Sequence, residues 1–349
     1  NISLTIDDPL LMRLSYGKIQ EECDTFKKPY KMGTLYITSN GGENSKVQAK
    51  NVYHLTVAGV SRLVHEGDVK SAMRKALALA TTNGAKNVVV LPNAVDPTEE
   101  QFTPKPVESD LIRFGWLGGS SHLHDLKILE DLFQRMEPYK EKSQVFLCGF
   151  DIRGTVTEIN SETKEQTRRA IKPHETVWYM FENIFTNNHK LISPEYKVFL
   201  EKFKEEDDSK FAHEFYRRVW TRPVQSYAKN YTKFDVSLAP LKNHIFNQVK
   251  SQLKVIEAGF YKKALIASNL GPYTIDLTHS LNNGNFVDGN ALLVDEKRNH
   301  SDWFKYVKKL IDNPSWAEDL GERLYETVKD RYDLNVVTHT RAEFYKSLI

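Results

Sequence analysis

The sequence predicts an α/β protein with parallel β-sheets arranged in two domains. Short apolar, β-branched runs alternate with longer segments of helical periodicity, as expected for a layered fold with parallel strands. The chain has 349 residues, which is more than one hydrophobic core usually organises. Apolar residues make up 40% of the chain and charged residues 27%, so we expect a folded protein rather than a disordered one.

The first domain is expected over residues 1–105. A strand is predicted over residues 2–6 and a helix over residues 68–83, where Gly84 stops the helical pattern. The apolar run at residues 87–91 predicts a short buried strand that ends at a proline. The polar, proline-containing stretch that follows this strand marks the domain boundary, near residue 105.

The second domain is expected over residues 106–330. It opens with a strand over residues 111–117, followed by a tight turn at residues 118–121. Residues 122–139 predict one helix, because apolar side chains recur at helical spacing. This stripe consists of Leu126, Leu129, Leu132, Phe133 and Met136. The next strand is predicted at residues 145–148.

Residues from about 152 to 216 are expected to form an insertion in the second domain, with helices of its own. Residues 201–210 hold eight charged side chains in ten, which is too polar for a core strand. Bulky aromatic residues argue against wholesale disorder. These are Trp178, Tyr179, Phe181 and Phe185.

The regular pattern returns after the insertion. Three more strands are predicted, at residues 234–240, 264–268 and 291–294. A helix is predicted from about residue 250 to residue 261, and another begins near Asn313-Pro314, a plausible cap and first-turn proline. We expect the C-terminal helix, at residues 331–349, to pack back on the first domain.

The net charge and the cysteine content limit the partners and the cellular location that we expect for the protein. The formal net charge of +2 is low for a protein that binds nucleic acid, so we expect no nucleic-acid partner. The two cysteines, Cys23 and Cys148, lack metal-ligand spacing, and Cys148 lies in an apolar run typical of a buried thiol. Two cysteines cannot form a disulfide-rich scaffold, so a reducing cytoplasm is expected. No run approaches about 18 apolar residues, so we expect no membrane-spanning helix.

The turn after the first strand of the second domain is a candidate phosphate site. Gly118, Gly119 and Ser120 are small enough for a ligand to approach the backbone, and a following helix would offer free N–H groups to an anion. The dinucleotide fingerprint Gly-x-Gly-x-x-Gly and the P-loop sequence are both absent. An ordinary strand-to-helix turn is the alternative interpretation.

The helix predicted near residue 250 carries a second set of candidates. Lys250, Lys254 and Glu257 recur at helical spacing and share one face. Asn247 and Ser251 add hydrogen-bonding groups where the helix begins. The lysines could neutralise a diphosphate, and the carboxylate could accept hydrogen bonds from a ribose. The alternative is a solvated face with one weak Lys–Glu pair.

Two other residues with metal-ligand chemistry lie close together, at His122 and His124, next to Asp125. No matching third or fourth ligand stands out elsewhere in the sequence. We therefore expect a polar turn with Asp125 at a helix start, and no metal site.

Four segments, taken in order, resemble one known family. They are Val88–Asp96, Gly115–Gly119, Asp235–Leu241 and Lys250–Gly259. Together they are similar to the retaining "glycosyl transferases group 1" family of GT-B glycosyltransferases, and the Lys-Ser-x-x-Lys-x-x-Glu pattern resembles a bacterial subgroup. The resemblance runs from about residue 60 to the end, without the insertion.

The resemblance implies two Rossmann-like domains, the N-terminal one incomplete, and metal-independent, cofactor-free sugar transfer from a UDP- or GDP-linked donor with retention of configuration. It places Glu257 against the donor ribose, and Lys250, Ser251 and the Gly118-Gly119 turn around the diphosphate. Val249 stands where the family carries its first motif glutamate. The catalytic residues are not identified.

The acceptor implied by the resemblance is a glycan or a lipid-linked intermediate of polysaccharide biosynthesis in the bacterial cell envelope. Peripheral association with the inner face of the membrane is the alternative to a freely cytoplasmic protein. Two other functions stay open. One is a non-catalytic nucleotide-sugar binding protein, favoured by Val249 and the short first domain. The other is a nucleotide-sugar epimerase of the same architecture.

Overall fold

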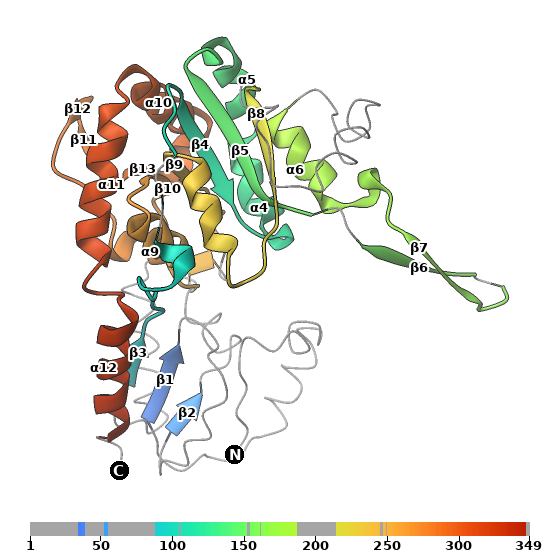
Figure 1. Cartoon of the computed structure of the whole chain (residues 1–349), viewed down its shortest axis with the longest axis horizontal. Coiled ribbons are helices and arrows are strands. Elements are labelled where there is room, and N and C mark those ends of the chain that lie inside the picture. Colours follow the sequence, from blue (N-terminus) through green and yellow to red (C-terminus); the bar gives the residue numbers. More distant parts are fainter. Residues whose placement is uncertain are drawn as a thin grey trace.

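A computed structural model of the chain shows two parallel sheets joined by a short connection (Figure 1). It describes residues 34–38, 52–54, 88–103, 105, 107–151, 154–160, 162–186, 214–244, 247–248 and 250–346. The strand predicted at residues 2–6, the helix predicted at residues 68–83, Cys23 and Val249 lie outside these ranges. No helix in the described part of the chain is both long and apolar enough to cross a bilayer.

The first sheet has the strand order β2-β1-β3, and both pairings are parallel. Its strands are β1 (Thr34–Thr38), β2 (Val52–His54) and β3 (Val88–Leu91). The strand predicted at residues 87–91 is therefore confirmed as β3.

The second sheet has six strands in the order β13-β10-β9-β4-β5-β8, and all five pairings are parallel. Its strands are β4 (Ile112–Leu117), β5 (Ser143–Phe150), β8 (Tyr216–Trp220), β9 (Val236–Ala239), β10 (Ala264–Ser268) and β13 (Leu292–Val294). The chain builds outward from β4 to β5 and β8, then returns to the other side of β4 to build β9, β10 and β13. The order of the strands therefore reverses between β4 and β9. The predicted α/β class with parallel strands is confirmed.

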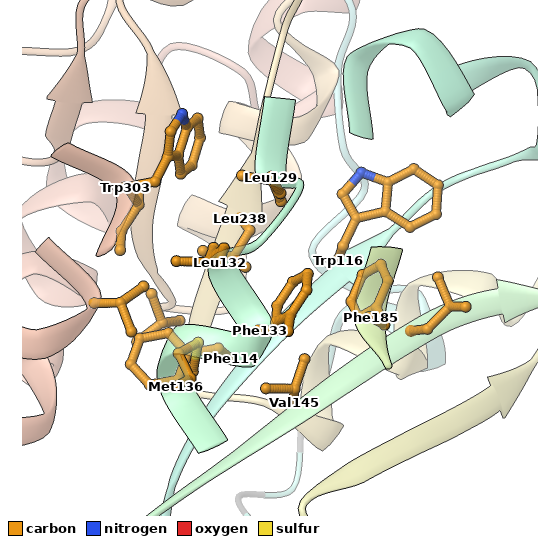
Figure 2. Close-up of a cluster of buried hydrophobic side chains, with 14 of the residues drawn as sticks. Phe114, Trp116, Leu129, Leu132, Phe133, Met136, Val145, Phe185, Leu238 and Trp303 are labelled. Atoms are coloured by element: carbon orange, nitrogen blue, oxygen red, sulfur yellow. The ribbon is translucent and has the colours of Figure 1, made fainter. Parts of the chain in front are cut away.

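Helices cover both faces of the second sheet because its strands are apolar on both faces. They are α4 (Leu123–Leu126), α5 (Leu132–Met136), α6 (Val177–Phe185), α9 (Leu253–Phe260), α10 (Asn299–Asp312) and α11 (Ser315–Val328). Figure 2 shows one of the two cores, where Phe133 of α5 stacks on Phe185 of α6 with ring centroids 4.2 Å apart. All five residues of the stripe predicted between residues 122 and 139 are buried.

The single helix predicted over residues 122–139 is wrong. The segment forms α4, a short 3-10 turn at Lys127–Leu129, and then α5. The break lies at Asp131, whose φ of 67° is left-handed and cannot continue a right-handed helix. The apolar stripe continues across the break because both pieces pack on the same face of the sheet.

The predicted insertion contains more than helices. Its described part includes an antiparallel hairpin of β6 (Thr155–Ile159) and β7 (Gln166–Ala170), which projects from the body of the protein (Figure 1). Helix α6 packs into the core of the second sheet through Trp178, Phe181 and Phe185. The charged stretch at residues 201–210 lies outside the described residues.

Two short chain segments cross side by side between the sheets. Val95, after β3, accepts a hydrogen bond from Leu334 N (2.8 Å) and donates one to Tyr332 O (2.9 Å). The last helix, α12 (Leu334–Lys346), then runs beside β3, and Arg341 Nη2 donates to Pro92 O at 2.5 Å (Figure 1). The domain boundaries themselves stay a prediction.

Candidate functional site

The candidate site lies where the strand order of the second sheet reverses. Ligands of open α/β sheets bind beyond the carboxyl ends of the strands, at such a reversal. The Gly118-Gly119 turn follows the carboxyl end of β4, and the loop at Pro240–Lys242 follows that of β9. Lys250 and then helix α9, which carries Lys254, follow the loop after β9 in the chain.

Asp125 joins these two loops. Its Oδ1 accepts hydrogen bonds from Lys242 N (2.9 Å) and Asn247 Nδ2 (2.7 Å), and its Oδ2 pairs with His122 Nδ1 (2.8 Å). The side chain of Asp125 is only 7% exposed. Burial alone would raise the pKa of Asp125, but the bonds from His122 and Lys242 and the charge of Lys250 outweigh burial and lower it. Asp125 is therefore a buried carboxylate that stays ionised at neutral pH.

Lys250 has a mostly buried side chain whose ammonium group has an incomplete set of partners. Its Nζ lies 3.8 Å from Asp125 Oδ2, too far for a strong hydrogen bond, and its side chain is 16% exposed. Within the described part of the chain, Lys250 has no closer partner. Burial lowers the pKa of this lysine, and Asp125 opposes that effect. A mostly buried cation of this kind favours an anionic ligand.

Lys254 lies one helical turn further and meets the glycine turn directly. Its Nζ donates to the carbonyl of Leu117 and lies 5.1 Å from the centre of the Trp116 ring. Burial lowers the pKa of Lys254 to about 8, and the charge of Lys250 adds to this effect. A Cβ on Gly118 would come within 3.2 Å of Lys254 Nζ and still closer to Trp116, so glycine is needed there. The predicted glycine turn and lysine helix therefore share one edge of the sheet.

Gly149 lets β5 approach the same turn. Its φ is +96°, and a Cβ there would collide with the carbonyl of Gly118. Gly118 N in turn donates to Cys148 O at 3.3 Å, and Cys148 is fully buried, as predicted from its apolar surroundings. Burial raises the pKa of the Cys148 thiol to about 12, so it stays protonated. This packing holds the turn against the sheet and leaves Gly119 and Ser120 exposed.

Glu257 is not on a solvated face, so that alternative interpretation of the helix is wrong. The residue is 3% exposed, because it packs in the second hydrophobic core. Tyr227 donates a hydrogen bond to its Oε1, and Tyr231 donates one to its Oε2 at 3.1 Å. Burial raises the pKa of Glu257, although both tyrosines lower it. Any contact of this carboxylate with a ribose stays a prediction.

Ser251 links the site to the segment that leaves the first sheet. Its Oγ accepts a hydrogen bond from Asn93 Nδ2 at 2.9 Å, and Asn93 is buried. Of the predicted residues, Asn247, Lys250 and Lys254 therefore gather around Asp125 and the turn, whereas Ser251 and Glu257 face other partners. Helix α9 begins at Leu253, three residues later than predicted.

From the sequence, His122 and Asp125 were considered only as weak candidates for metal ligands and as part of a polar turn. Within the described residues, no group of three or more His, Cys, Asp or Glu side chains could hold a metal ion. The structure instead places Asp125 at the first turn of α4, as expected, and makes it the centre of the polar cluster. The signal that could have revealed this role is the pairing of an acidic residue after β4 with polar residues after β9.

No protein-family model and no curated protein matches the sequence. Solved structures do resemble the fold. The Anabaena protein Alr3699/HepE, crystallised with UDP and glucose, gives a TM-score of 0.50 at 10% identity, over 84% of this chain and 68% of its own. A glycosyltransferase from Rickettsia africae ESF-5 gives 0.49 at 13% identity, over 100% of this chain and 84% of its own. The likeness to HepE supports the predicted GT-B-like fold.

Proposed function

We propose that the protein is a glycosyltransferase that moves a sugar from a nucleoside-diphosphate donor to an acceptor. The observation that carries the proposal is the convergence of Lys250 and Lys254 with the Gly118-Gly119 turn where the strand order reverses. Lysines and exposed backbone N–H groups suit a diphosphate, because both neutralise or bind phosphate oxygens. The fold likeness to HepE, which was crystallised with UDP and glucose, supports a UDP-linked donor as the first candidate.

In this mechanism the second domain stabilises the leaving group. As the bond from the sugar to the diphosphate breaks, negative charge grows on the diphosphate, and preorganised cations lower the energy of that state. Lys254 is fixed by the carbonyl of Leu117, and Asp125 holds the charge of Lys250 at the same edge. Retention of configuration, metal independence, and a glycan or lipid-linked acceptor in the bacterial envelope are parts of the proposal that rest on the family resemblance.

Binding of a ribose by Glu257 requires a specific exchange. The hydroxyl of Tyr227 now donates to Oε1, so a ribose hydroxyl would have to replace it as the donor. Tyr227→Phe removes the competing hydroxyl and keeps the ring, so we expect nucleotide affinity to be retained or increased. Glu257→Gln should weaken the affinity for nucleotide. Equal affinities in the wild type and both variants would assign Glu257 to the core alone.

Calorimetric titration with UDP, GDP and their nucleosides tests the diphosphate site. Lys250→Ala should weaken the binding of the diphosphates by about tenfold or more and the binding of the nucleosides much less, because a charge-assisted contact is lost. Lys262→Ala is the matched control. Lys262 follows α9, is 49% exposed and pairs with Glu322 at 2.9 Å. Loss of affinity in both variants, or in neither, would contradict the proposed site.

Turnover separates the enzyme from its alternatives. Incubation of the protein with a bound sugar nucleotide and mixed glycan acceptors should release free nucleoside diphosphate and extend an acceptor. Binding without release would support the non-catalytic binding protein. Conversion of the sugar nucleotide to an isomer without any acceptor would support the epimerase.

A further inference from the structure

One ring nitrogen of His122, Nδ1, is hydrogen bonded to Asp125, and the other, Nε2, has no partner among the described residues. Its Nδ1 lies 2.8 Å from Asp125 Oδ2, and the carboxylate is fixed by Lys242 N and Asn247 Nδ2 on its other oxygen. An ionised carboxylate only accepts hydrogen bonds, so Nδ1 carries the proton and Nε2 of the neutral ring has a lone pair. Within the described residues Nε2 has no partner, and the side chain is 26% exposed.

The ring lies in the same cluster of charges as the two lysines. Lys254 faces it from α9, Lys250 from the segment just before α9, and Asp125 from α4. Trp116 contributes an uncharged edge-to-face contact, with ring centroids 6.3 Å apart. Burial lowers the pKa of His122, the hydrogen bond to Asp125 opposes this, and the charges of Lys254 and Lys250 lower it further. The free protein therefore keeps His122 neutral at pH 7.

A bound diphosphate would reverse this balance. Its negative charges would offset those of Lys250 and Lys254, which now disfavour a third cation. A phosphate oxygen facing the lone pair of a neutral Nε2 would be repelled, whereas a protonated Nε2 would donate a hydrogen bond to it. Asp125 is already in place to stabilise the positive ring through Nδ1.

We propose that His122, held by Asp125, is a further ligand of the donor diphosphate and takes up one proton when the diphosphate binds. This inference rests on the proposed function. The proton passes from solvent to Nε2, the Nδ1 proton stays in place, and the same proton returns to solvent when the diphosphate leaves. Affinity for the donor therefore increases as the pH falls across the interval between the pKa of His122 in the free protein and its higher pKa in the complex.

The experiment measures proton uptake by calorimetry in buffers of different ionisation enthalpy, with UDP-glucose and GDP-glucose as probes. Their diphosphates carry no group that titrates near neutral pH, so any proton taken up goes to the protein. We expect uptake of up to one proton per bound probe by the wild type near the ordinary histidine pKa of 6.5, and no uptake by His122→Gln. Where uptake is complete, the affinity should fall about tenfold for each unit by which the pH rises.

The matched control is His124→Gln. His124 lies two residues away and is exposed, so the variant should keep the uptake and affinity of the wild type. Nuclear magnetic resonance of the His122 ring in the wild type gives a second readout, because Nε2 should become protonated on addition of the probe. This measurement needs no variant to fold.

The outcomes separate the two proposals. If the wild type binds a probe without proton uptake, or His122→Gln takes up as many protons, the inference on His122 is overturned and the proposed function stands. If the wild type binds neither probe, the proposed function fails, and the inference fails with it.

Discussion

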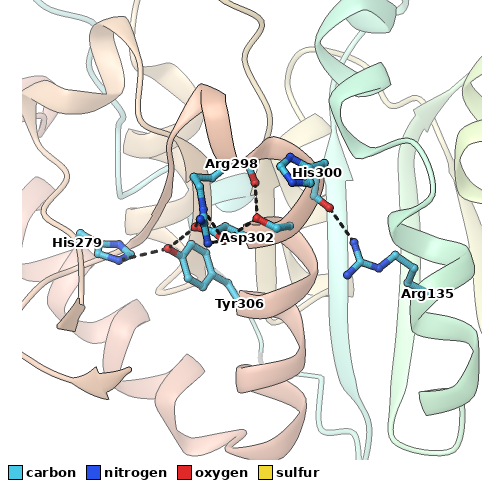
Figure 3. Close-up of polar contacts among 7 residues, drawn as sticks. Arg135, His279, Arg298, His300, Asp302 and Tyr306 are labelled. Carbon is cyan, nitrogen blue, oxygen red and sulfur yellow. Dashed lines mark hydrogen bonds and ion pairs between the residues drawn. The ribbon is translucent and has the colours of Figure 1, made fainter. Parts of the chain in front are cut away.

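Two clusters contain a partly buried histidine and a carboxylate, and they differ in how many ring nitrogens of the histidine have protein partners. The second cluster joins His279 to Asp302 and Tyr306 of α10 (Figure 3). His279 Nδ1 accepts a hydrogen bond from Leu293 N (2.9 Å), and its Nε2 lies 3.5 Å from Tyr306 Oη. Tyr306 Oη lies 3.4 Å from Asp302 Oδ2, and Asp302 also binds Arg298. Both ring nitrogens of His279 therefore face protein groups.

The His122 cluster lacks this closure. Among the described residues, Nε2 of His122 has no hydrogen-bond partner, and Lys250 Nζ has only the carboxylate of Asp125, 3.8 Å away. A cluster whose polar groups bind one another contributes to folding, whereas partly exposed titratable groups with few protein partners are available to a ligand. The His122 cluster also lies at the reversal of strand order, and the His279 cluster does not.

The largest expected effect is on stability, at Asp125. Asp125→Ala leaves Lys242 N and His122 Nδ1 without their acceptor and removes one of the two acceptors of Asn247 Nδ2. We therefore expect a loss of about 3–5 kcal/mol in the free energy of unfolding. Urea unfolding measures it. Asp302→Ala is the comparison, with a smaller expected loss because its partner Arg298 is 57% exposed and can be solvated. Equal losses would remove the distinction between the clusters.

The next effect is on binding, at Lys254. Lys254→Met keeps the packing on Trp116 and removes the charge, so donor affinity at pH 7 should fall about tenfold. In the wild type, affinity should also fall as the pH rises above about 8, where the free lysine loses its proton. Titrations from pH 7 to 9.5 check this, and the variant should lack the alkaline decrease. If the variant also lost affinity at alkaline pH, the decrease would have to come from the titration of a group other than Lys254.

A smaller effect concerns His279. Burial lowers its pKa from the ordinary value of 6.5, so the unfolded chain binds more protons than the folded one below that pH. The stability that a neutral His279 provides is present above pH 6.5 and is lost as the pH falls through its folded-state pKa. Melting temperatures from pH 8 to 5 should therefore decrease less steeply for His279→Gln than for the wild type. Donor binding should be unchanged in this variant.

The smallest effect is expected at Arg298. Its ion pair with Asp302 joins residues four apart at 3.1 Å, and the arginine side chain is 57% exposed, so water and salt screen the attraction. Arg298→Ala should leave the melting temperature unchanged within error at physiological salt. A clear decrease would show that the closed cluster depends on this exposed arginine.

Local pattern was enough to predict most of the second sheet. β10 has the predicted bounds, Ala264–Ser268, because five consecutive apolar or small residues suit a strand buried on both faces. The break at Asp131 was missed, since a residue in a left-handed conformation leaves the apolar spacing around it intact. The boundary of α9 was also placed too early.

The polar cluster was harder to predict because its partners are distant in sequence. Asp125 meets Lys242 and Asn247 across 117 and 122 residues. Glu257 similarly meets Tyr227 and Tyr231 from a separate 3-10 segment, so its burial could not be seen from α9 alone. The residues of the candidate site were proposed from one helix and one turn, but which of them face each other depends on the strand order.

The paired crossing at Val95 limits how the two sheets can move. The outgoing and returning chain segments are hydrogen bonded to each other there, so they cannot shift independently. Within the described residues, rotation of one sheet against the other would therefore bend both segments together at this crossing. Asn93 lies two residues before Val95 and donates a hydrogen bond to Ser251, just before α9. Even a small rotation of the sheets would therefore change this contact beside the candidate site.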